Sequence, residues 1–260
     1  MSATQKTPWR RLRGAAGVRF TVTVLALTAA ASTTASCAPG LNVRGLGQST
    51  PTSTWASMSP GSGERGAAAQ LLSRLRVIEA LPDVPGYDRS CQTEKGVKHA
   101  CVFGPAWSDD TTAPDGHNGC DSRTDSIAAA AREVRRSGRC KIASGVLDDP
   151  YTGRAVPFTA ATIAVVQIDH LISLHRAWQL GAAAWPLDRR AAFANDVDLE
   201  LVVTTSINQV KGDRGIGEWQ PPNAGYRCEY ATKYATVSIA YDLPVTRADW
   251  DALTATLSVC

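Results

Sequence analysis

Six cysteines between residues 91 and 260 constrain the fold of this chain more than any other feature of its sequence. They are Cys91, Cys101, Cys120, Cys140, Cys228 and Cys260. Their spacings do not include the CxxC or CxxH pattern of a structural zinc site. In an exported protein such an even set is expected to be oxidised. Pairing of sequence neighbours gives 91–101, 120–140 and 228–260, although six cysteines allow other connectivities. Each bridge would stabilise the fold by about 2–4 kcal/mol.

The first 37 residues predict export. They contain no Asp or Glu, and an apolar run of 12 residues, FTVTVLALTAAA (20–31), is followed by small residues up to Cys37. The basic residues of this segment are Lys6, Arg10, Arg11, Arg13 and Arg19. A basic start, a short apolar stretch and a small-residue exit are typical of a secretory signal peptide. A spanning helix needs about 20 apolar residues, so this run is too short to remain as an anchor.

Cys37 leaves two forms of the mature protein open. It follows Thr-Ala-Ser, which resembles a weak lipobox, but Thr34 stands where a Leu is expected. A lipid on Cys37 would tether the protein to the outer face of the membrane, whereas ordinary cleavage nearby would release it. The predicted location is therefore secreted or extracytoplasmic, with a membrane-anchored lipoprotein as the alternative.

The remaining sequence divides into a spacer and one domain. Residues 38–65 are rich in Gly, Ser, Thr and Pro, which predicts a flexible linker. Hydrophobic residues make up 44% of the chain and charged residues 20%, so residues 66–260 can bury a core and are expected to form a single domain.

The charge of the mature part argues against tight non-specific binding of nucleic acid. Five of the 27 Lys and Arg precede Cys37, so 22 remain against 24 acids, and the net charge is −2. A nucleic-acid binder usually has a clear basic excess. An enzyme that releases its product needs only a local basic groove.

Hydrophobic patterning predicts a mixed α+β fold. Helices are expected over 71–81 (LLSRLRVIEAL), from a cap at Thr124 or Asp125 to Arg136, within 171–185, over a short stretch at 206–213, and over 226–243 and 248–257. A hairpin is expected at 142–158 around the turn DPYTG, and further strands at IAVVQI (163–168) and LELVVTT (199–205).

The pair Asp169-His170 is the first candidate for chemistry. It stands directly after the apolar strand IAVVQI, and functional groups are often placed where a strand ends. A lone Asp-His pair is more often structural than functional. The order of the following elements decides between these interpretations: a helix, a second strand, and then a short helix that carries Asn208, Lys211 and Asp213.

In this order the sequence resembles the HNH (ββα-metal) nuclease superfamily, and in particular its exported bacterial branch, which is similar to the C-terminal domain of GmrSD-type restriction endonucleases. The segments that carry the resemblance are YDR (87–89), CDSR (120–123), VLDDPYTG (146–153), VQIDHLISLHRAWQLGAAAW (166–185), Arg190 with FAND (193–196), Asn208 with KGD (211–213), and WQPP (219–222). The resemblance implies a ββα-metal core embedded in a helix-rich, disulfide-stapled domain.

The resemblance also implies roles for individual residues. Asp169 and Asn208 would be metal ligands, His170 the general base, and Lys211 a contact of the scissile or adjacent phosphate. A neutral imidazole can accept a proton from the attacking water, which suits His170. Arg123 would either bind a phosphate bidentately or lock a loop through a salt bridge. His175, about one helical turn beyond His170, is either a further phosphate contact or a helix-surface residue without a role.

These ligands indicate a hard divalent cation and a nucleic-acid substrate. Mg²⁺ prefers oxygen ligands and keeps several waters, so one carboxylate and one amide oxygen suffice, with Mn²⁺ as the alternative. The resemblance implies nucleic acid, with DNA as the expected form, and the sequence indicates no protein partner.

Two departures from the family pattern weaken this interpretation. Leu199 stands where the family often has an Asn that braces the loop, so Asn195 or Asp198 would have to supply that support. No His follows Asn208, which favours Mg²⁺ over a His-rich zinc or nickel site. An inactive exported module that only binds a partner, and a metallophosphoesterase for small substrates, are therefore the alternatives to a nuclease.

Overall fold

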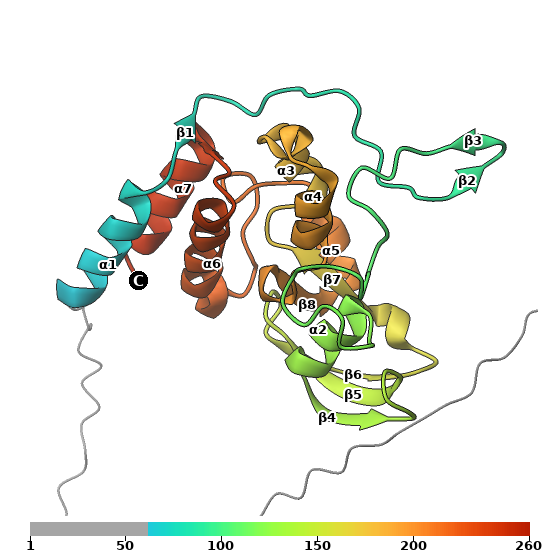
Figure 1. Cartoon of the computed structure of the whole chain (residues 1–260). Coiled ribbons are helices and arrows are strands. Elements are labelled where there is room, and N and C mark those ends of the chain that lie inside the picture. The colour runs from blue at the N-terminus through green and yellow to red at the C-terminus, as the bar shows by residue number, and fades with distance from the viewer. Residues whose placement is uncertain (1–61) are drawn as a thin grey trace, which may run out of the picture. The chain divides into compact units, whose positions relative to one another are not determined.

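The computed structural model describes residues 62–260 (Figure 1). The predicted signal peptide, Cys37 and most of the predicted linker lie outside the described residues. Helix α1 (Ser62–Ser73) begins inside the segment that was predicted to be a linker. The described residues belong to one compact unit with both helices and strands, which confirms the α+β class.

The hairpin predicted around DPYTG is present. Strands β5 (Ile142–Asp149) and β6 (Arg154–Thr159) pair in antiparallel register from Ser144↔Thr159 to Asp149↔Arg154. Gly153 closes the turn with a φ of 69°, a left-handed conformation that glycine adopts without strain. A third strand, β4 (Ala131–Arg136), completes a sheet of order β4-β5-β6.

Strand β4 corrects the prediction of a helix that continues to Arg136. Helix α2 (Ser122–Ala130) begins after Asp121, whose side chain accepts a hydrogen bond from the Thr124 backbone N–H, and it ends at Ala130. The chain then pairs with β5 across a bulged register that includes Arg132↔Val146. Pairing with a distant strand outweighs the helix propensity of the Ala-rich stretch. Differences in helix propensity between ordinary residues are only a few tenths of a kcal/mol, and the whole scale of strand propensity spans only about 1 kcal/mol.

The predicted helix over 71–81 is also wrong beyond its first residues. After α1 ends at Ser73, β1 (Val77–Ile78) pairs in parallel with β9 (Val245–Thr246). The apolar residues that suggested the helix still pack against the main core: Leu71, Leu72, Leu75, Ile78 and Leu81. The pattern therefore identified a buried face but not the backbone conformation that buries it.

A second antiparallel pair carries the residues of interest. Strand β7 (Val166–His170) pairs with β8 (Glu200–Thr204), and helix α5 (Thr205–Lys211) follows β8 without a loop. The expected strand at 163–168 starts later than its apolar run, because residues Ile163–Val165 form a 3-10 turn. Two antiparallel strands followed by a helix is the order that was predicted for the core.

Helical segments fill the connection between β7 and β8. They are α3 (Leu174–Gln179), a 3-10 turn at Ala182–Ala184, α4 (Leu187–Ala194) and a 3-10 turn at Val197–Leu199. This agrees with the helical character that was expected for 171–185. Ser173 caps α3 by accepting a hydrogen bond from the Arg176 backbone N–H.

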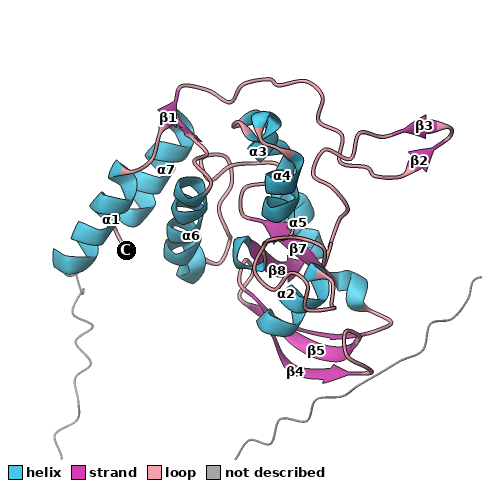
Figure 2. Cartoon of the chain, viewed as in Figure 1, coloured by secondary structure: helices cyan, strands magenta, loops and turns pink. Residues whose placement is uncertain are grey.

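The C-terminal helices pack on α1. Helix α6 (Arg227–Ala240) follows a 3-10 turn at Ala224–Tyr226, and α7 (Arg247–Leu257) starts with a capping box formed by Thr246 and Asp249. Helices α1, α6 and α7 contact one another, on the side of the unit away from the β4-β5-β6 sheet (Figure 2). Both helices predicted for this region are confirmed to within a few residues at their ends.

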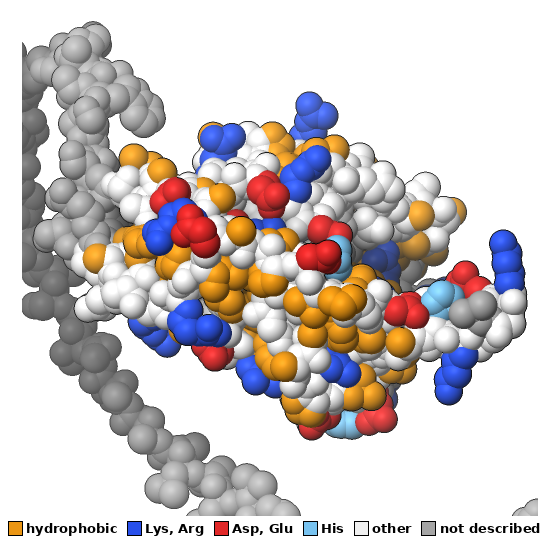
Figure 3. Space-filling model, turned by 90° about the horizontal axis from the view of Figure 1, so that it is seen from above, with side chains coloured by type: hydrophobic (Ala, Val, Ile, Leu, Met, Phe, Trp, Pro, Cys, Tyr) orange, Lys and Arg blue, Asp and Glu red, His pale blue; other side chains and the backbone are white. Residues whose placement is uncertain are grey.

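All three nearest-neighbour disulfides are present: Cys91–Cys101, Cys120–Cys140 and Cys228–Cys260. The first closes the loop that carries a small hairpin of β2 (Thr93–Glu94) and β3 (Val97–Lys98). Within residues 62–260 no helix combines the length and the apolar character needed to span a bilayer. On the face seen in Figure 3, basic and acidic side chains are interspersed, in keeping with the small net charge.

Candidate functional site

One cavity of about 250 Å³ brings together three of the residues singled out from the sequence. Its walls include Asp169 and His170 at the end of β7 and Asn208 on α5. The remaining lining residues are Tyr87, Arg89, Gln167, Ile168, Ser173, Leu174, Gln209, Gly212 and Asp213. The end of β7 and helix α5 therefore bring Asp169, His170 and Asn208 to one cavity, as the sequence led us to expect.

Asn208 is held by the strand that carries Asp169. Its side-chain N–H group donates to Gln167 Oε1 at 3.0 Å and to the Ile168 carbonyl at 3.4 Å. Both contacts use the amide nitrogen, so the amide oxygen is left available for another ligand. This arrangement results directly from α5 following β8 and turning back over β7.

The carboxylate of Asp169 is almost completely buried and is engaged by two side chains. Lys211 Nζ donates to Oδ1 at 2.8 Å, and the hydroxyl of Tyr151 donates to Oδ2. Burial raises the pKa of the Asp169 carboxyl, whereas the nearby Lys211 ammonium and these two hydrogen bonds act to lower it. A carboxylate can accept about four hydrogen bonds in all, so each oxygen keeps acceptor capacity.

His170 has a defined tautomer. Its Nε2 lies 3.1 Å from the Ala194 carbonyl, which can only accept, so Nε2 carries the proton and Nδ1 of the neutral ring is free to accept one. The ring is stacked between Trp107 and Phe193, with centroid distances of 6.3 Å and 6.5 Å. Burial, together with the charge of Arg89, lowers the pKa of His170 to about 3.

Glu200 is a residue of this region that the sequence did not reveal. It lies directly opposite His170 in the β7–β8 register, and its Oε1 is 3.6 Å from His170 Nε2. Ser126 Oγ donates to Oε2 at 2.6 Å, while Oε1 is buried and accepts no hydrogen bond from residues 62–260. Burial raises the pKa of Glu200 to about 7. Knowledge of the strand register would have been needed to find it, because within LELVVTT it is simply one acid in an apolar run.

The positions of Lys211, Arg123 and His175 differ from the predicted phosphate contacts. Lys211 has a side-chain exposure of 0% and is committed to Asp169 and to the His170 carbonyl, so its ammonium cannot reach a phosphate in this arrangement. Arg123 Nη2 donates to the Val166 carbonyl at 2.7 Å and fastens α2 to β7. His175 Nδ1 lies 3.0 Å from Asp213 Oδ2, and its Nε2 lies 3.3 Å from Gln179 Nε2. All three are engaged in internal contacts.

Asn195, one of the two residues expected to brace the loop in place of Leu199, is fully buried and hydrogen-bonded. Its side-chain oxygen accepts hydrogen bonds from the Ser108 backbone N–H at 2.7 Å and from Ser122 Oγ at 3.1 Å. Its amide nitrogen donates to the Ala191 carbonyl at 2.9 Å. The side chain therefore joins α4, α2 and the loop before α2.

The donors in the cavity suit a hard cation. Within residues 62–260 no three His, Cys, Asp or Glu side chains are placed to hold a metal ion together, so a ligand-rich site of the zinc type is absent from the described part. The walls instead offer oxygen atoms from Asp169, Asn208, Gln167 and Asp213. One or two such ligands are enough for Mg²⁺, which keeps most of its waters. The residues present fit this ion.

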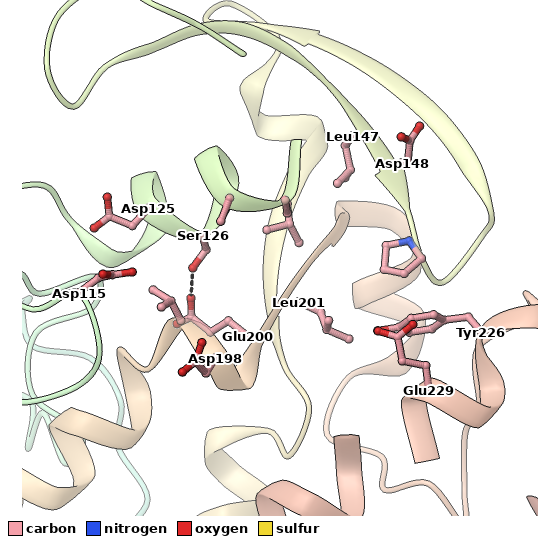
Figure 4. A pocket seen from close by; sticks show the side chains of 15 residues that line it. Asp115, Asp125, Ser126, Leu147, Asp148, Asp198, Glu200, Leu201, Tyr226 and Glu229 are labelled. Atoms are coloured by element: carbon pink, nitrogen blue, oxygen red, sulfur yellow. Dashed lines mark hydrogen bonds between the residues drawn. The ribbon is translucent and has the colours of Figure 1, made fainter. Parts of the chain in front are cut away.

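A larger cavity of about 390 Å³ lies on the other side of Glu200, between α2, β5 and α6 (Figure 4). Its acidic lining residues are Asp115, Asp125, Asp148, Asp198, Glu200 and Glu229, and no Lys, Arg or His lines it. Phosphates would be repelled by this set of carboxylates. The smaller cavity beside His170 is therefore the better candidate for an active site on a phosphate ester.

Comparison with known proteins connects this cavity with a family. The model of the family described as GmrSD restriction endonucleases, C-terminal domain, matches residues 121–256, which is more than half of the chain. The chain belongs to this family. The GmrSD C-terminal match begins at the cap of α2 and ends within α7, so it includes β7, β8, α5 and the cavity between them.

A protein described as an "Uncharacterized secreted protein" of Arthroderma benhamiae is 38% identical to this GmrSD family member over 143 residues, which are 54% of this chain and 68% of the relative. No solved structure matches the chain.

Proposed function

We propose that this protein is an exported, metal-dependent endonuclease that hydrolyses phosphodiester bonds, with DNA as its substrate. The single observation that supports this most is the shared cavity of Asp169, His170 and Asn208 within a member of an endonuclease domain family. The oxygen-rich walls and the buried imidazole suit hydrolysis of a phosphate ester.

His170 acts as the general base in this proposal. The hydrogen bond from Nε2 to the Ala194 carbonyl fixes the ring so that Nδ1 is the atom that accepts the proton of the attacking water. Because burial and the charge of Arg89 hold the pKa of His170 far below 7, the ring stays in its proton-accepting form at neutral pH. The His170 side chain is only 6% exposed, and Trp107 and Phe193 are the aromatic neighbours that lie roughly parallel to its ring.

Asp169 and Asn208 would hold a divalent cation, Mg²⁺ or Mn²⁺. When bound, such an ion stabilises negative charge on the phosphate and on the leaving oxygen, which contributes several kcal/mol. Lys211 and Tyr151 keep the Asp169 side chain in one orientation through their hydrogen bonds. In this proposal Lys211 is thus a positioning residue and not a phosphate contact.

Export rests on separate observations. The acid-free leader, the three disulfides of the described residues and the relative described as secreted all support an extracytoplasmic location. Mass spectrometry of the mature N-terminus, on protein purified from the native host, distinguishes the lipid-anchored form from the cleaved and released form. A lipid on Cys37 indicates a membrane-anchored lipoprotein, and a free N-terminus near that position indicates a secreted one.

A plasmid-nicking assay on the oxidised mature protein tests the activity. We expect cleavage with Mg²⁺ or Mn²⁺ and none with EDTA. His170→Ala should lower the rate by about 10²–10⁴-fold, the usual contribution of a general base. His117→Ala is the matched control, because His117 is an exposed histidine outside this cavity. Equal inactivity of wild type and His170→Ala with every metal would instead favour a binding module.

A further inference from the structure

Neither of the basic residues predicted to contact a phosphate, Lys211 and Arg123, lines the cavity. Lys211 is buried against Asp169, and Arg123 donates to a backbone carbonyl of β7. A phosphodiester carries a full negative charge that has to be matched inside a small cavity. The divalent cation of the proposed function would match part of this charge, and a basic side chain in the same cavity would add directional hydrogen bonds that orient the phosphate.

Arg89 lies on the wall of this cavity, and no acid of the described residues pairs with it. Among residues 62–260 its guanidinium takes part in no ion pair and no hydrogen bond, although the cavity lining includes Asp169 and Asp213. A guanidinium offers five N–H donors in a planar arrangement that matches two oxygens of a phosphate. Arg89 therefore has both the free donors and the location that Lys211 lacks.

Trp107 connects Arg89 with the proposed general base, His170. Its guanidinium carbon is 5.8 Å from the centroid of Trp107, and Trp107 stacks on the His170 ring at a centroid distance of 6.3 Å. The charge of Arg89 also acts to lower the pKa of both His170 and Glu200. The arginine thus lies over the aromatic wall beside the imidazole, within electrostatic reach of the base.

The backbone around Arg89 is fixed by a disulfide-closed loop. The Val102 backbone N–H donates to the Asp88 carbonyl at 3.0 Å, and the Cys101 N–H donates to the Ser90 carbonyl at 3.1 Å. The Cys91–Cys101 bridge closes this loop two residues after Arg89. A cation on a restrained backbone loses less conformational entropy on binding than one on a mobile loop.

We propose that Arg89 is a phosphate-binding residue that holds the nucleic-acid backbone against the His170 face of the cavity. This rests on the proposed nuclease function and names the side chain that recognises the substrate. The contact is made to phosphate oxygens, so it is independent of base sequence.

Binding can be measured separately from cleavage. Fluorescence anisotropy of a labelled duplex of about 20 base pairs is followed in Mg²⁺ at several salt concentrations, in the His170→Ala background. We expect Arg89→Gln to weaken binding by about tenfold, which corresponds to loss of a charged hydrogen bond. The slope of log K against log salt should decrease in magnitude by about 1, the loss expected for one phosphate contact.

Two further variants separate a phosphate contact from a structural role. Arg89→Lys should restore most of the salt slope but only part of the affinity, because a lysine keeps the charge without the planar donors. Arg189→Gln is the matched control: its guanidinium also lies over a tryptophan, Trp185 at 4.2 Å, but away from this cavity. We expect it to bind like the His170→Ala parent.

Two results would overturn the proposal. One is equal affinity and salt slope for the parent and Arg89→Gln. The other is loss of binding in Arg89→Gln that is accompanied by loss of the cooperative urea unfolding transition and is not improved by Arg89→Lys. Absence of nicking by the wild type, together with the expected binding results, would reject the nuclease function and leave the phosphate site in place.

Discussion

Lys211 Nζ lies 2.8 Å from Asp169 Oδ1, and the side-chain exposures of the two residues are 0% and 5%. The ammonium also donates to the His170 carbonyl at 3.0 Å. This buried ion pair joins α5 to the end of β7, so the last turn of the helix and the acid–imidazole pair are held as one unit. Removal of either charge leaves the other without compensation in the protein interior.

Lys211→Met should therefore destabilise the protein by about 3–5 kcal/mol, the usual effect of breaking a buried pair by removal of one partner. Urea unfolding under oxidising conditions measures the loss. The double variant Asp169→Asn/Lys211→Met should regain a large part of it, because no charge is then left unpaired. A double variant that is as unstable as the sum of the two single changes would show that the pair is not coupled.

The raised pKa of Glu200 predicts that the stability of the protein depends on pH. Burial raises its pKa from 4.5 to about 7, so the folded state keeps the proton that the unfolded state loses. The protonated Glu200 carboxyl makes its full contribution to the free energy of unfolding below pH 4.5. This contribution is lost as the pH rises towards 7, and the loss amounts to about 3 kcal/mol at most. Glu200→Gln removes this loss and should be more stable than wild type at pH 8, but not at pH 4.5. Chemical denaturation at both pH values tests it, and Glu229→Gln, an exposed acid on α6, is the control.

His170 should stay unprotonated in the folded protein between pH 8 and pH 5. The chain has 4 histidines, and burial lowers the pKa of His170 to about 3. Its proton NMR signal should therefore stay constant between pH 8 and pH 5, and His170→Gln assigns the signal. Because the unfolded state binds the proton more readily, this residue lowers the stability as the pH falls below about 6.5. A normal titration curve near pH 6.5 for His170 would contradict the burial.

The elements that the sequence predicted well are those defined by local signals. The turn after Asp149 and the apolar run before Asp169 identify their hairpin and strand without knowledge of the rest of the chain. The cysteine pairs also follow sequence proximity. From these signals and the family resemblance, Asp169, His170 and Asn208 could be placed near one another before the fold was known.

The features that the sequence did not predict depend on distant contacts. Strand β4 exists because β5 pairs with it, although the sequence of Ala131 and its neighbours suits a helix. Lys211 is buried only because α5 turns back over β7, and the role of Glu200 requires the β7–β8 register. Arg89 is recognised as a candidate only when the structure shows that it lines the cavity and that Lys211 and Arg123 are engaged elsewhere.

The Cys228–Cys260 disulfide should contribute more to stability than Cys91–Cys101. It joins the start of α6 to the C-terminus across a separation of 32 residues, compared with 10 for the other bridge. A longer loop loses more entropy on closure in the unfolded chain, which gives about 3–4 kcal/mol for the long loop and about 1 kcal/mol less for the short one. Urea midpoints of the variants Cys228→Ser/Cys260→Ser and Cys91→Ser/Cys101→Ser measure the two effects. The second variant should instead weaken binding of a duplex, because its bridge holds together the two segments whose backbone hydrogen bonds lie on either side of Arg89. The opposite ranking in both measurements would contradict these assignments.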